Sequence, residues 1–404
     1  MKKMKKNYQL IHVIAVSVAT FLIASCSKDS LVDSMNASGS SIVAIDVTEN
    51  GTNPDDANLS SVSAKQSTNG YLYTESNDAG LNSILMYVMD DGGSLSLQST
   101  TNSGGAGAGV GLGSQGAIAL DDANEWLFAV NAGGNSISSF MINADGNLTL
   151  ASTISSGGEM PVSIDVWGNY LYVTNFLSSN INGYMIGADG SLTAIAGSNL
   201  TLSTDNAQPA QIKFNPSGNV IYVTEKHTNR ITEYLINNAG MAHSKDWRHS
   251  SGVEPFGFDF ARDIYMVVSN AEAGVPNATS VTSYMTSETG LVNDVNGAIP
   301  SDQTAACWVA VTYHGRYALV TNTGSNTISS YYINGLGQLT LVQATAATTD
   351  AGPLDITMLG NYYVYTLNGE GQTIGEYVRE SAGGLTNTGS ETDVPAFAAG
   401  LVGF

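Results

Sequence analysis

The sequence is poor in positive charge. It holds 14 Lys and Arg residues against 35 Asp and Glu residues in 404, and four of the lysines lie in the first six residues. Without that end, ten basic and 35 acidic residues remain, a formal charge of −25. So acidic a surface repels phosphate backbones and anionic lipids, which argues against nucleic-acid binding and direct adsorption to a membrane. Apolar residues make up 43% of the chain, enough for a large core.

Residues and loops that hold metals or cofactors are equally scarce. The two cysteines and five histidines show no zinc spacing, and no phosphate loop or nucleophile elbow occurs. No helical pattern follows the Gly-rich stretch 104–116, so a dinucleotide loop is not expected there. The Asp-Gly pairs at Asp145 and Asp189 lack the spacing of a calcium loop and predict hairpin turns instead. We therefore expect neither a cofactor nor a metal site.

The N-terminus carries an apolar run, residues 11–24, directly after its lysines. The run is shorter than a typical membrane-spanning helix and has the proportions of a secretory signal. It ends Leu22-Ile-Ala-Ser-Cys26, which resembles the lipobox of bacterial lipoproteins, and that resemblance implies lipidation of Cys26. An ordinary signal peptide with an incidental cysteine is the alternative.

This resemblance gives an expected location and domain plan. Residues 27–30 resemble a charged signal that takes some Gram-negative lipoproteins to the cell surface. We expect a signal peptide at 1–25 and a lipid-anchored tether at 26–65, rich in Ser, Asn and Asp, with one stray strand at 41–47. The protein is then an outer-membrane lipoprotein that faces the periplasm or the cell surface, and the lipid is its only membrane contact.

A short apolar, tyrosine-rich run recurs seven times in the rest of the chain. Consecutive copies end 44 to 55 residues apart, about 49 on average. That is the expected length of one four-stranded propeller blade, and seven such lengths account for residues 66–404. The copies end at Ser76, Asn131, Asn175, Glu225, Asn270, Asn322 and Asn368.

Each repeat carries the signals of four strands. A second strand alternates apolar and polar residues, a Gly-containing turn follows, a third strand opens with leucine, and the fourth usually follows a proline. No helical period competes. The sequence predicts an all-β fold, a seven-bladed β-propeller of four-stranded antiparallel blades over 66–404. Residues 394–402 read as one more Pro-led strand, which we expect to pair into the first blade and close the ring.

The signature Tyr172-Val-Thr-Asn175, repeated with variation, resembles the bacterial lactonase-like propellers. That family is named for 6-phosphogluconolactonase and is similar to fungal carboxymuconate-lactonising enzymes. The stretches 104–116, 223–226, 255–258 and 306–308 resemble a secreted branch of it. The resemblance covers roughly residues 66–404 and implies a seven-bladed propeller whose family activity is lactone hydrolysis.

The fold places a site at the central channel, because the innermost strand of each blade lines it. Catalytic members of the family tend to carry His or Arg in the segments that lead into those strands. Here the matching positions hold Val162-Ser163 and Ala210-Gln211, so both residue types are missing. Glu225 stands where most other copies have Asn, and Glu225 with His227 forms our candidate catalytic pair. A surface loop that leaves the strand end is the alternative interpretation of the pair.

The same leading segments supply candidate ligand-binding residues. Amides there can hydrogen-bond a ligand and aromatic rings can stack on it, although the rings can equally pack between blades. Cys307 is a possible nucleophile only beside a histidine, and a lone cysteine in an apolar strand is more often a small buried residue. The candidates are Gln115, Gln211, Phe256, Cys307, Trp308 and Asp355.

Two functions remain open from the sequence. The first is a hydrolase that opens an unphosphorylated lactone at the channel mouth, with Glu225 activating water and Gln115 and Gln211 polarising the carbonyl. The second is a non-catalytic cell-envelope propeller that binds a glycan, a small molecule or a protein there. A structural adhesion module is a third possibility that no residue singles out. In each case we expect a monomer.

Overall fold

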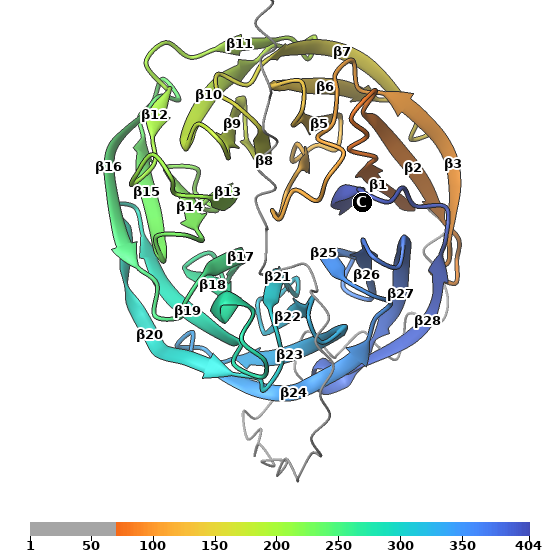
Figure 1. Cartoon of the computed structure of the whole chain (residues 1–404), viewed down its shortest axis with the longest axis vertical. Helices are drawn as coiled ribbons and strands as arrows, with labels where there is room; N and C mark the ends of the chain where they lie inside the picture. Colours follow the sequence, from red (N-terminus) through yellow and green to blue (C-terminus); the bar gives the residue numbers. More distant parts are fainter. Residues whose placement is uncertain (1–69) are drawn as a thin grey trace, which may run out of the picture.

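The computed structural model describes residues 70–404. The predictions for the signal peptide, for Cys26 and for the tether with its stray strand lie outside the described residues. Within them, the chain forms seven antiparallel sheets arranged as blades around a central axis (Figure 1). The predicted seven-bladed all-β propeller is confirmed. The blades are numbered here in chain order.

In blades 1 to 4, most sheets follow the chain from the axis to the rim. The strands are, in blade 1, β29 (Ala399–Gly403), β1 (Gly70–Glu75), β2 (Ser83–Met89) and β3 (Leu95–Asn102); in blade 2, β4 (Ile118–Leu120), β5 (Trp126–Asn131), β6 (Ser136–Ile142) and β7 (Leu148–Ser155); in blade 3, β8 (Pro161–Trp167), β9 (Tyr170–Asn175), β10 (Asn180–Ile186), β11 (Leu192–Ala194) and β12 (Leu200–Thr201); in blade 4, β13 (Pro209–Phe214), β14 (Val220–Glu225), β15 (Arg230–Ile236) and β16 (Ala242–His249).

Blades 5 to 7 repeat this order. Two one-turn helices, η1 (Glu272–Gly274) and η2 (Ser381–Gly383), interrupt them, and no helix among the described residues has the length and hydrophobicity to cross a membrane. The strands are, in blade 5, β17 (Pro255–Ala261), β18 (Tyr265–Asn270), β19 (Ser280–Ser287) and β20 (Gly290–Pro300); in blade 6, β21 (Ala306–Val311), β22 (Tyr317–Asn322), β23 (Thr327–Ile333) and β24 (Leu339–Thr348); in blade 7, β25 (Pro353–Leu359), β26 (Tyr363–Asn368), β27 (Thr373–Arg379) and β28 (Leu385–Glu391).

The hydrophobic core lies in the seams between neighbouring blades. Among the described residues, buried side chains form seven clusters, one for each seam. The tyrosine-rich runs are the second strands, and β14 and β18 are buried along their whole length. Because both faces of such a strand meet another blade, the run needs apolar residues at nearly every position.

The aromatic residues of these runs interlock neighbouring blades. Tyr73 Oη donates to Gly146 O at 2.8 Å, and Tyr172 Oη donates to Gly240 O at 2.8 Å, each in a turn of the next blade. Gly146 has φ +79°, and a Cβ there would lie 2.4 Å from the ring of Tyr71. The recurring tyrosine and the recurring glycine turn are therefore the two halves of one contact.

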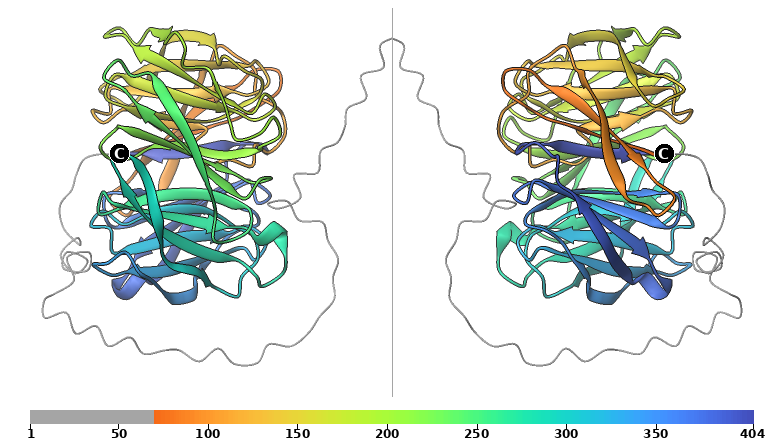
Figure 2. Two further views of the ribbon diagram at one scale, coloured as in Figure 1. Left: turned by 90° about the vertical axis from the view of Figure 1, so that its left-hand side faces the viewer. Right: turned by 90° about the vertical axis from the view of Figure 1, so that its right-hand side faces the viewer.

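The C-terminal strand closes the ring as predicted. Strand β29 pairs with β1 in the register Tyr73↔Val402, and Phe404 N donates to Tyr71 O at 3.0 Å. The strand begins at Ala399, five residues later than the sequence predicted. Side views show the ring as a short drum with β29 running through it and the C-terminus at one face (Figure 2).

Blade 3 differs from the others at its rim. Its outer edge consists of two short strands, β11 and β12, which both pair with β10 and are separated by residues 195–199. The outer strands of the other blades each run for seven residues or more without a break. The rim of the ring is therefore interrupted beside blade 4.

Candidate functional site

The Gly-rich loop between β3 and β4 closes one end of the central channel. Gln115 N donates to Ala210 O of blade 4 at 3.1 Å, and the Gln115 side chain bonds Val309 of blade 6 through both its atoms, at 3.0 and 3.2 Å. Ser163 Oγ of blade 3 donates to Gln115 O at 2.6 Å. A loop that contacts three blades on different sides of the axis spans the channel.

Glycines allow this close approach. Gly116 has φ +74°, and a Cβ on Gly107 would lie 2.1 Å from the backbone of Asn77. The loop is fastened by Lys226, whose Nζ donates to Gly113 O at 2.6 Å and lies 5.2 and 4.7 Å from the ring centroids of Phe176 and Phe256. Burial lowers the pKa of Lys226 to about 8.

A cavity of about 420 Å³ occupies the rest of the channel, beyond the loop. Its wall comes from the later residues of the inner strands and from Asn124 in the β4–β5 turn, with Gln115 and Gly116 of the loop at its base. The first two residues of the Pro-led strands, such as Pro209 and Ala210, do not reach it. The C-terminal residues Val402 and Gly403 line it, so it lies toward the face that holds the C-terminus.

Four charged side chains face this cavity. Lys213 Nζ lies 2.6 Å from Asp259 Oδ1, the one ion pair among the described residues. Asp259 Oδ2 also accepts from Val311 N at 2.9 Å, and Asp165 Oδ2 accepts from Phe214 N at 2.8 Å. Asp165, Lys213 and Asp259 occupy the fifth position of β8, β13 and β17 and so form one layer across three neighbouring blades.

The electrostatics of this layer bring the pKa of one carboxyl group, that of Asp165, toward neutral pH. Burial raises the pKa of Asp165 to about 6, although the charge of Lys213 opposes the rise. Burial alone would lower the pKa of Lys213, but the carboxylates of Asp259 and Asp165 outweigh it and raise the pKa. Lys213 thus stays a cation while Asp165 is partly protonated at mildly acidic pH.

Asp355 lies one layer closer to the loop. It is 2% exposed, and its Oδ1 accepts from Ile356 N at 2.8 Å. Burial raises the pKa of Asp355 to about 7, although donors from Gly116, Leu401 and Gln115 lower it. In the third position of a Pro-led strand, Asp355 corresponds to Gln211 of β13 and to Ser163 of β8.

A family comparison agrees with this architecture. The profile of the family described as lactonase, seven-bladed β-propeller, matches residues 67–199 and 167–306, more than half of the sequence. The chain belongs to this lactonase family. A search of curated protein sequences finds no match to it.

Solved structures share the fold of this lactonase-family chain. A candidate 6-phosphogluconolactonase from Bacteroides fragilis is 16% identical, covers 84% of this chain and 99% of its own, and has a TM-score of 0.66. A second one, from Bacteroides uniformis, is 17% identical, with 84% and 100% covered and a TM-score of 0.67. The periplasmic gluconolactonase of Pseudomonas aeruginosa is 16% identical, with 83% and 99% covered and a TM-score of 0.65. Identities this low show the fold alone.

The predicted catalytic pair, Glu225 and His227, lies outside the cavity. Glu225 ends β14, is fully buried, and accepts hydrogen bonds from Ser203 N at 2.9 Å and from the hydroxyls of Ser203, Thr228 and Thr232. His227 lies exposed in the turn that follows, where its N donates to Ala207 O at 3.2 Å. Strand β14 ends at Glu225, so the alternation of side chains between the two faces of the strand does not extend to His227. The two side chains are therefore not brought together.

The six predicted ligand-binding residues divide into two groups. Gln115, Gln211 and Asp355 line the cavity, and Gln211 Oε1 accepts from Phe258 N at 2.6 Å. The other three are fully buried in the cluster between blades 6 and 7 and lie outside the cavity lining; Phe256 and Trp308 meet edge to face with centroids 4.8 Å apart. For the rings the packing alternative holds, and Cys307 is a buried core residue. These three residues are Phe256, Cys307 and Trp308.

Sequence reasoning missed the charged layer of Asp165, Lys213 and Asp259. A signal existed, because each is the one charged residue in a Pro-led strand that is otherwise buried or apolar: PVSIDVW, PAQIKF and PFGFDFA. A charge in such a strand needs a partner or a water-filled space. No group of three or more His, Cys, Asp or Glu residues with metal-site geometry occurs within 70–404.

Proposed function

We propose that the protein hydrolyses an uncharged lactone in the channel cavity. The observation that carries the proposal is that Asp165, with its pKa raised to about 6, and the cation Lys213 face the same cavity. A carboxylate with such a pKa is a competent base at neutral pH, and a fixed cation in a partly buried site stabilises an oxyanion. The position of the site thereby moves from the predicted mouth, beside the leading segments, to the opposite half of the channel.

The chemistry uses the groups of both layers. Asp165 takes a proton from water, and the hydroxide adds to the lactone carbonyl carbon. Lys213 stabilises the negative charge on the carbonyl oxygen. Collapse of the tetrahedral intermediate breaks the ring C–O bond, and the protonated Asp355 gives its proton to the departing alkoxide. Water is consumed and a hydroxy acid is released, after which a proton returns from Asp165 to Asp355 through solvent.

The charges of the cavity favour a neutral substrate. Three carboxyl groups and one lysine face it, so the carboxylates outnumber the cation. A phosphate dianion would therefore meet net repulsion. Of the two substrates named by the similar structures, gluconolactone fits this cavity better than its 6-phosphate. The carboxylate product is repelled by the same charges, which favours its release.

The decisive experiment follows proton release from glucono-δ-lactone, from its 6-phosphate and from acyl-homoserine lactones, above the buffer rate. We expect turnover of the uncharged sugar lactone, and Asp165→Asn should lower kcat by about 10²- to 10⁴-fold. The matched control is Asp189→Asn in the exposed turn of the same blade, which should leave kcat unchanged. Equal rates in native protein and Asp165→Asn would remove Asp165 from the mechanism.

The rate should also depend on pH in a bell shape. Asp165 must be ionised, so kcat/KM rises as the pH passes about 6; Asp355 must be protonated, so it falls as the pH passes about 7. A flat profile between pH 5 and 8 would contradict these two roles.

The second candidate, a non-catalytic binding propeller, has one observation in its favour. Both side-chain amide atoms of Gln115 are engaged with the backbone of Val309, so Gln115 is not free to polarise a carbonyl as expected from the sequence. A ligand that raises the melting temperature and is recovered intact would favour this function.

We also propose, from the lipobox resemblance alone, that Cys26 anchors the protein to the outer membrane. Metabolic labelling with a radioactive fatty acid should mark the native protein and not Cys26→Ser. Equal labelling of both would reject the anchor at this residue, and protease treatment of whole cells would then distinguish a surface from a periplasmic orientation.

A further inference from the structure

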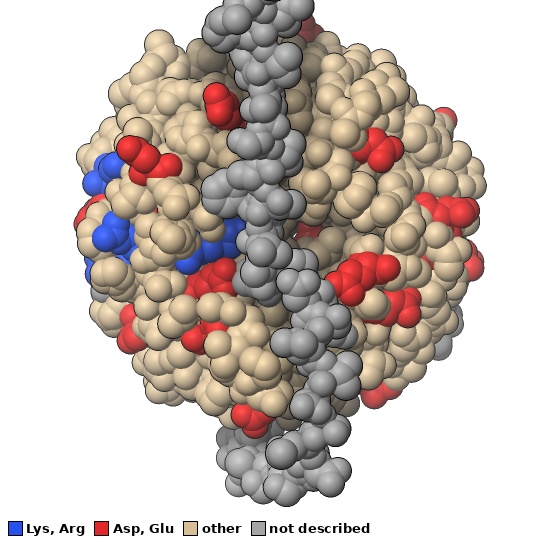
Figure 3. Space-filling model, in the orientation of Figure 1, with Lys and Arg blue, Asp and Glu red and all other residues tan. Residues whose placement is uncertain are grey.

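Blade 4 concentrates the positive charge of the molecule. Residues 70–404 contain eight Lys and Arg residues, and five of them lie in blade 4 or in its β14–β15 turn. In the space-filling view the basic atoms gather on one side of the ring, while acidic ones are scattered around the rest (Figure 3). The five are Lys213, Lys226, Arg230, Lys245 and Arg248.

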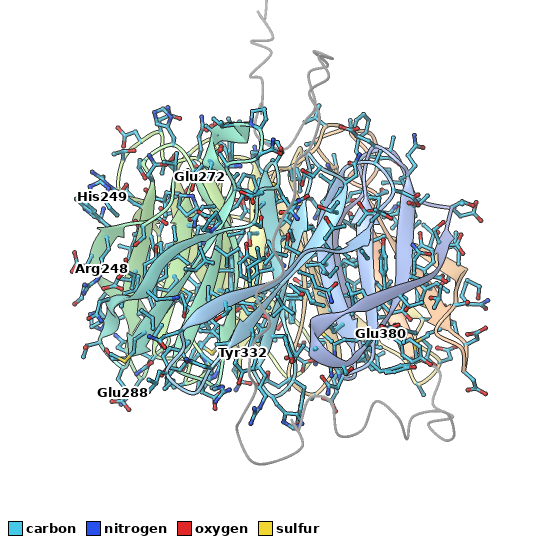
Figure 4. All side chains as sticks on the ribbon, turned by 90° about the horizontal axis from the view of Figure 1, so that it is seen from below. Arg248, His249, Glu272, Glu288, Tyr332 and Glu380 are labelled. Carbon is cyan, nitrogen blue, oxygen red and sulfur yellow. The ribbon has the colours of Figure 1, made fainter. Side chains whose placement is uncertain are left out.

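Part of this charge forms a row with an aromatic ring at the rim. Lys245, Trp247 and His249 are alternate residues of β16 and so point to one face of the sheet. Arg230 is the cross-strand partner of His249 and shares that face. These four residues are called the cation–aromatic stripe. Figure 4 shows His249 at the outer edge of the ring, far from the channel.

The stripe is accessible because blade 3 is incomplete beside it. Lys245 Nζ donates to Thr201 O at 3.1 Å, to Thr201 Oγ1 at 3.2 Å and to Leu202 O at 2.9 Å, at the end of the short strand β12. The break in the rim of blade 3 therefore lies next to the stripe. Residues 244–249 are all exposed, and Trp247 retains 38% of its surface.

Arg230 is held in place without an acceptor. Its Cζ lies 3.6 Å from the centroid of the Trp247 ring, and its Nε is buried with no hydrogen-bond partner among the described residues. No carboxylate of residues 70–404 pairs with it, since their one ion pair is Lys213 with Asp259. A buried donor without a partner costs free energy unless a ligand or water supplies an acceptor. A fixed guanidinium of this kind is suited to a carboxylate.

We propose that the cation–aromatic stripe binds a short acidic oligosaccharide of the uronate type. The apolar C–H face of a pyranose ring packs on the exposed part of Trp247, and a carboxylate of the sugar pairs with Arg230. Lys245, whose three donors are taken by Thr201 and Leu202, adds positive charge beside the site. Charge complementarity selects the acidic class, since the stripe is a basic patch on an acidic protein. We expect the bound oligosaccharide to be short. Salt screens carboxylates that lie farther than about 8–10 Å from the stripe, so they gain no attraction from it, and the acidic surface around the stripe repels them.

The test is calorimetric titration of the full chain with trigalacturonate at low and at physiological salt. We expect saturable binding that weakens with salt, and weakens about tenfold or more in Trp247→Ala and in Arg230→Gln. Trp247→Phe keeps a ring and should stay within about threefold of native. The control is Tyr313→Ala, which removes another exposed aromatic residue beside a histidine and should bind like the native protein.

Four outcomes would overturn the proposal. They are an absence of trigalacturonate binding by the native protein, equal weakening in Tyr313→Ala, equal binding of neutral galactotriose, and equal binding of pentaglutamate. The last would show an acidic-peptide surface. An absence of binding by any probe would show that the charges of β16 only protect an outer strand from edge-to-edge association. Melting curves of each variant ensure that lost binding is not lost folding.

Discussion

The two halves of the channel are built from the same seven inner strands but differ in chemistry. At the loop end, polar groups are paired inside the protein. Gln115 forms hydrogen bonds to blades 3, 4 and 6 through its backbone and its side chain. The ammonium group of Lys226 lies against two aromatic rings and donates to a backbone carbonyl. At the cavity end, Asp165 and Lys213 keep atoms that face open space. The difference teaches that burial of a charge marks a reactive site only where room for a substrate accompanies it.

Removal of residues 394–404 should have the largest effect, because it takes β29 from the wall of the cavity half and exposes the edge of β1. We expect the melting temperature to fall by at least about 10 °C, or the protein not to fold. Thermal unfolding followed by circular dichroism measures this. A melt unchanged by the truncation would reject closure of the ring by β29.

Lys213→Met should abolish turnover at the cavity end. Without the cation the pKa of Asp165 rises further, so the base is protonated at pH 7, and the oxyanion loses its partner. Asp259 also loses its ion pair, and the free energy of unfolding should fall by about 1–3 kcal/mol for this half-buried pair. Proton-release assays and denaturant unfolding measure the two effects. Retained turnover would mean that the oxyanion is stabilised elsewhere.

Lys226→Met tests the loop end, where we expect an effect on stability without one on kcat. The native pKa of about 8 lies below the ordinary value of 10.5, so the folded state loses stability as the pH falls from about 10.5 to 8. The variant lacks this penalty, and its gain relative to native should be greatest below pH 8 and vanish toward pH 10.5. A gain of about 2–5 °C at pH 7 is expected, less the lost bond to Gly113. A pH-independent difference would contradict this.

The smallest effects separate two buried glutamates, Glu75 and Glu225, which are the last residues of the second strands β1 and β14. Glu225→Gln should lower the melting temperature by about 2–4 °C, since four donors converge on its carboxylate. Glu75 has one buried oxygen without a partner, and burial raises its pKa well above the ordinary value, so Glu75→Gln should change the melt by less than about 1 °C. Neither should change kcat. Loss of turnover in Glu225→Gln alone would return it to the mechanism.

The repeat predicted the fold well, and it did so for a physical reason. Both faces of β9 or β14 must be buried between blades, which forces a recognisable apolar run. Turns such as those at Gly146, Gly240 and Gly337 need a glycine because an aromatic ring of the neighbouring blade packs against them. The closing strand was equally visible, although its start at Ala399 was not. Boundaries depend on hydrogen bonds of the particular chain, which composition does not encode.

The site was harder to predict, because a channel brings together residues about 50 positions apart. Gln115, Gln211 and Asp355 were found from their places in the leading segments, whereas Glu225 was singled out for departing from its repeat. That departure reflects local hydroxyl donors, which no strand pattern shows. Asp165 and Lys213 gain their meaning only from each other and from the cavity, so their role required the structure.

The interlocking of tyrosines and glycine turns has a consequence for engineering. A tyrosine hydroxyl such as that of Tyr73 fixes the position of a turn in the next blade, so insertions into those turns would separate the blades. On the opposite face, tyrosine hydroxyls such as those of Tyr184, Tyr234 and Tyr377 hold the ends of the outer strands of the preceding blades. The connections that follow those ends nevertheless range from four residues at 349–352 to fifteen at 103–117. Foreign loops, epitope tags and designed binding segments therefore belong within these connections, where the scaffold already accepts changes of length between fixed strand ends.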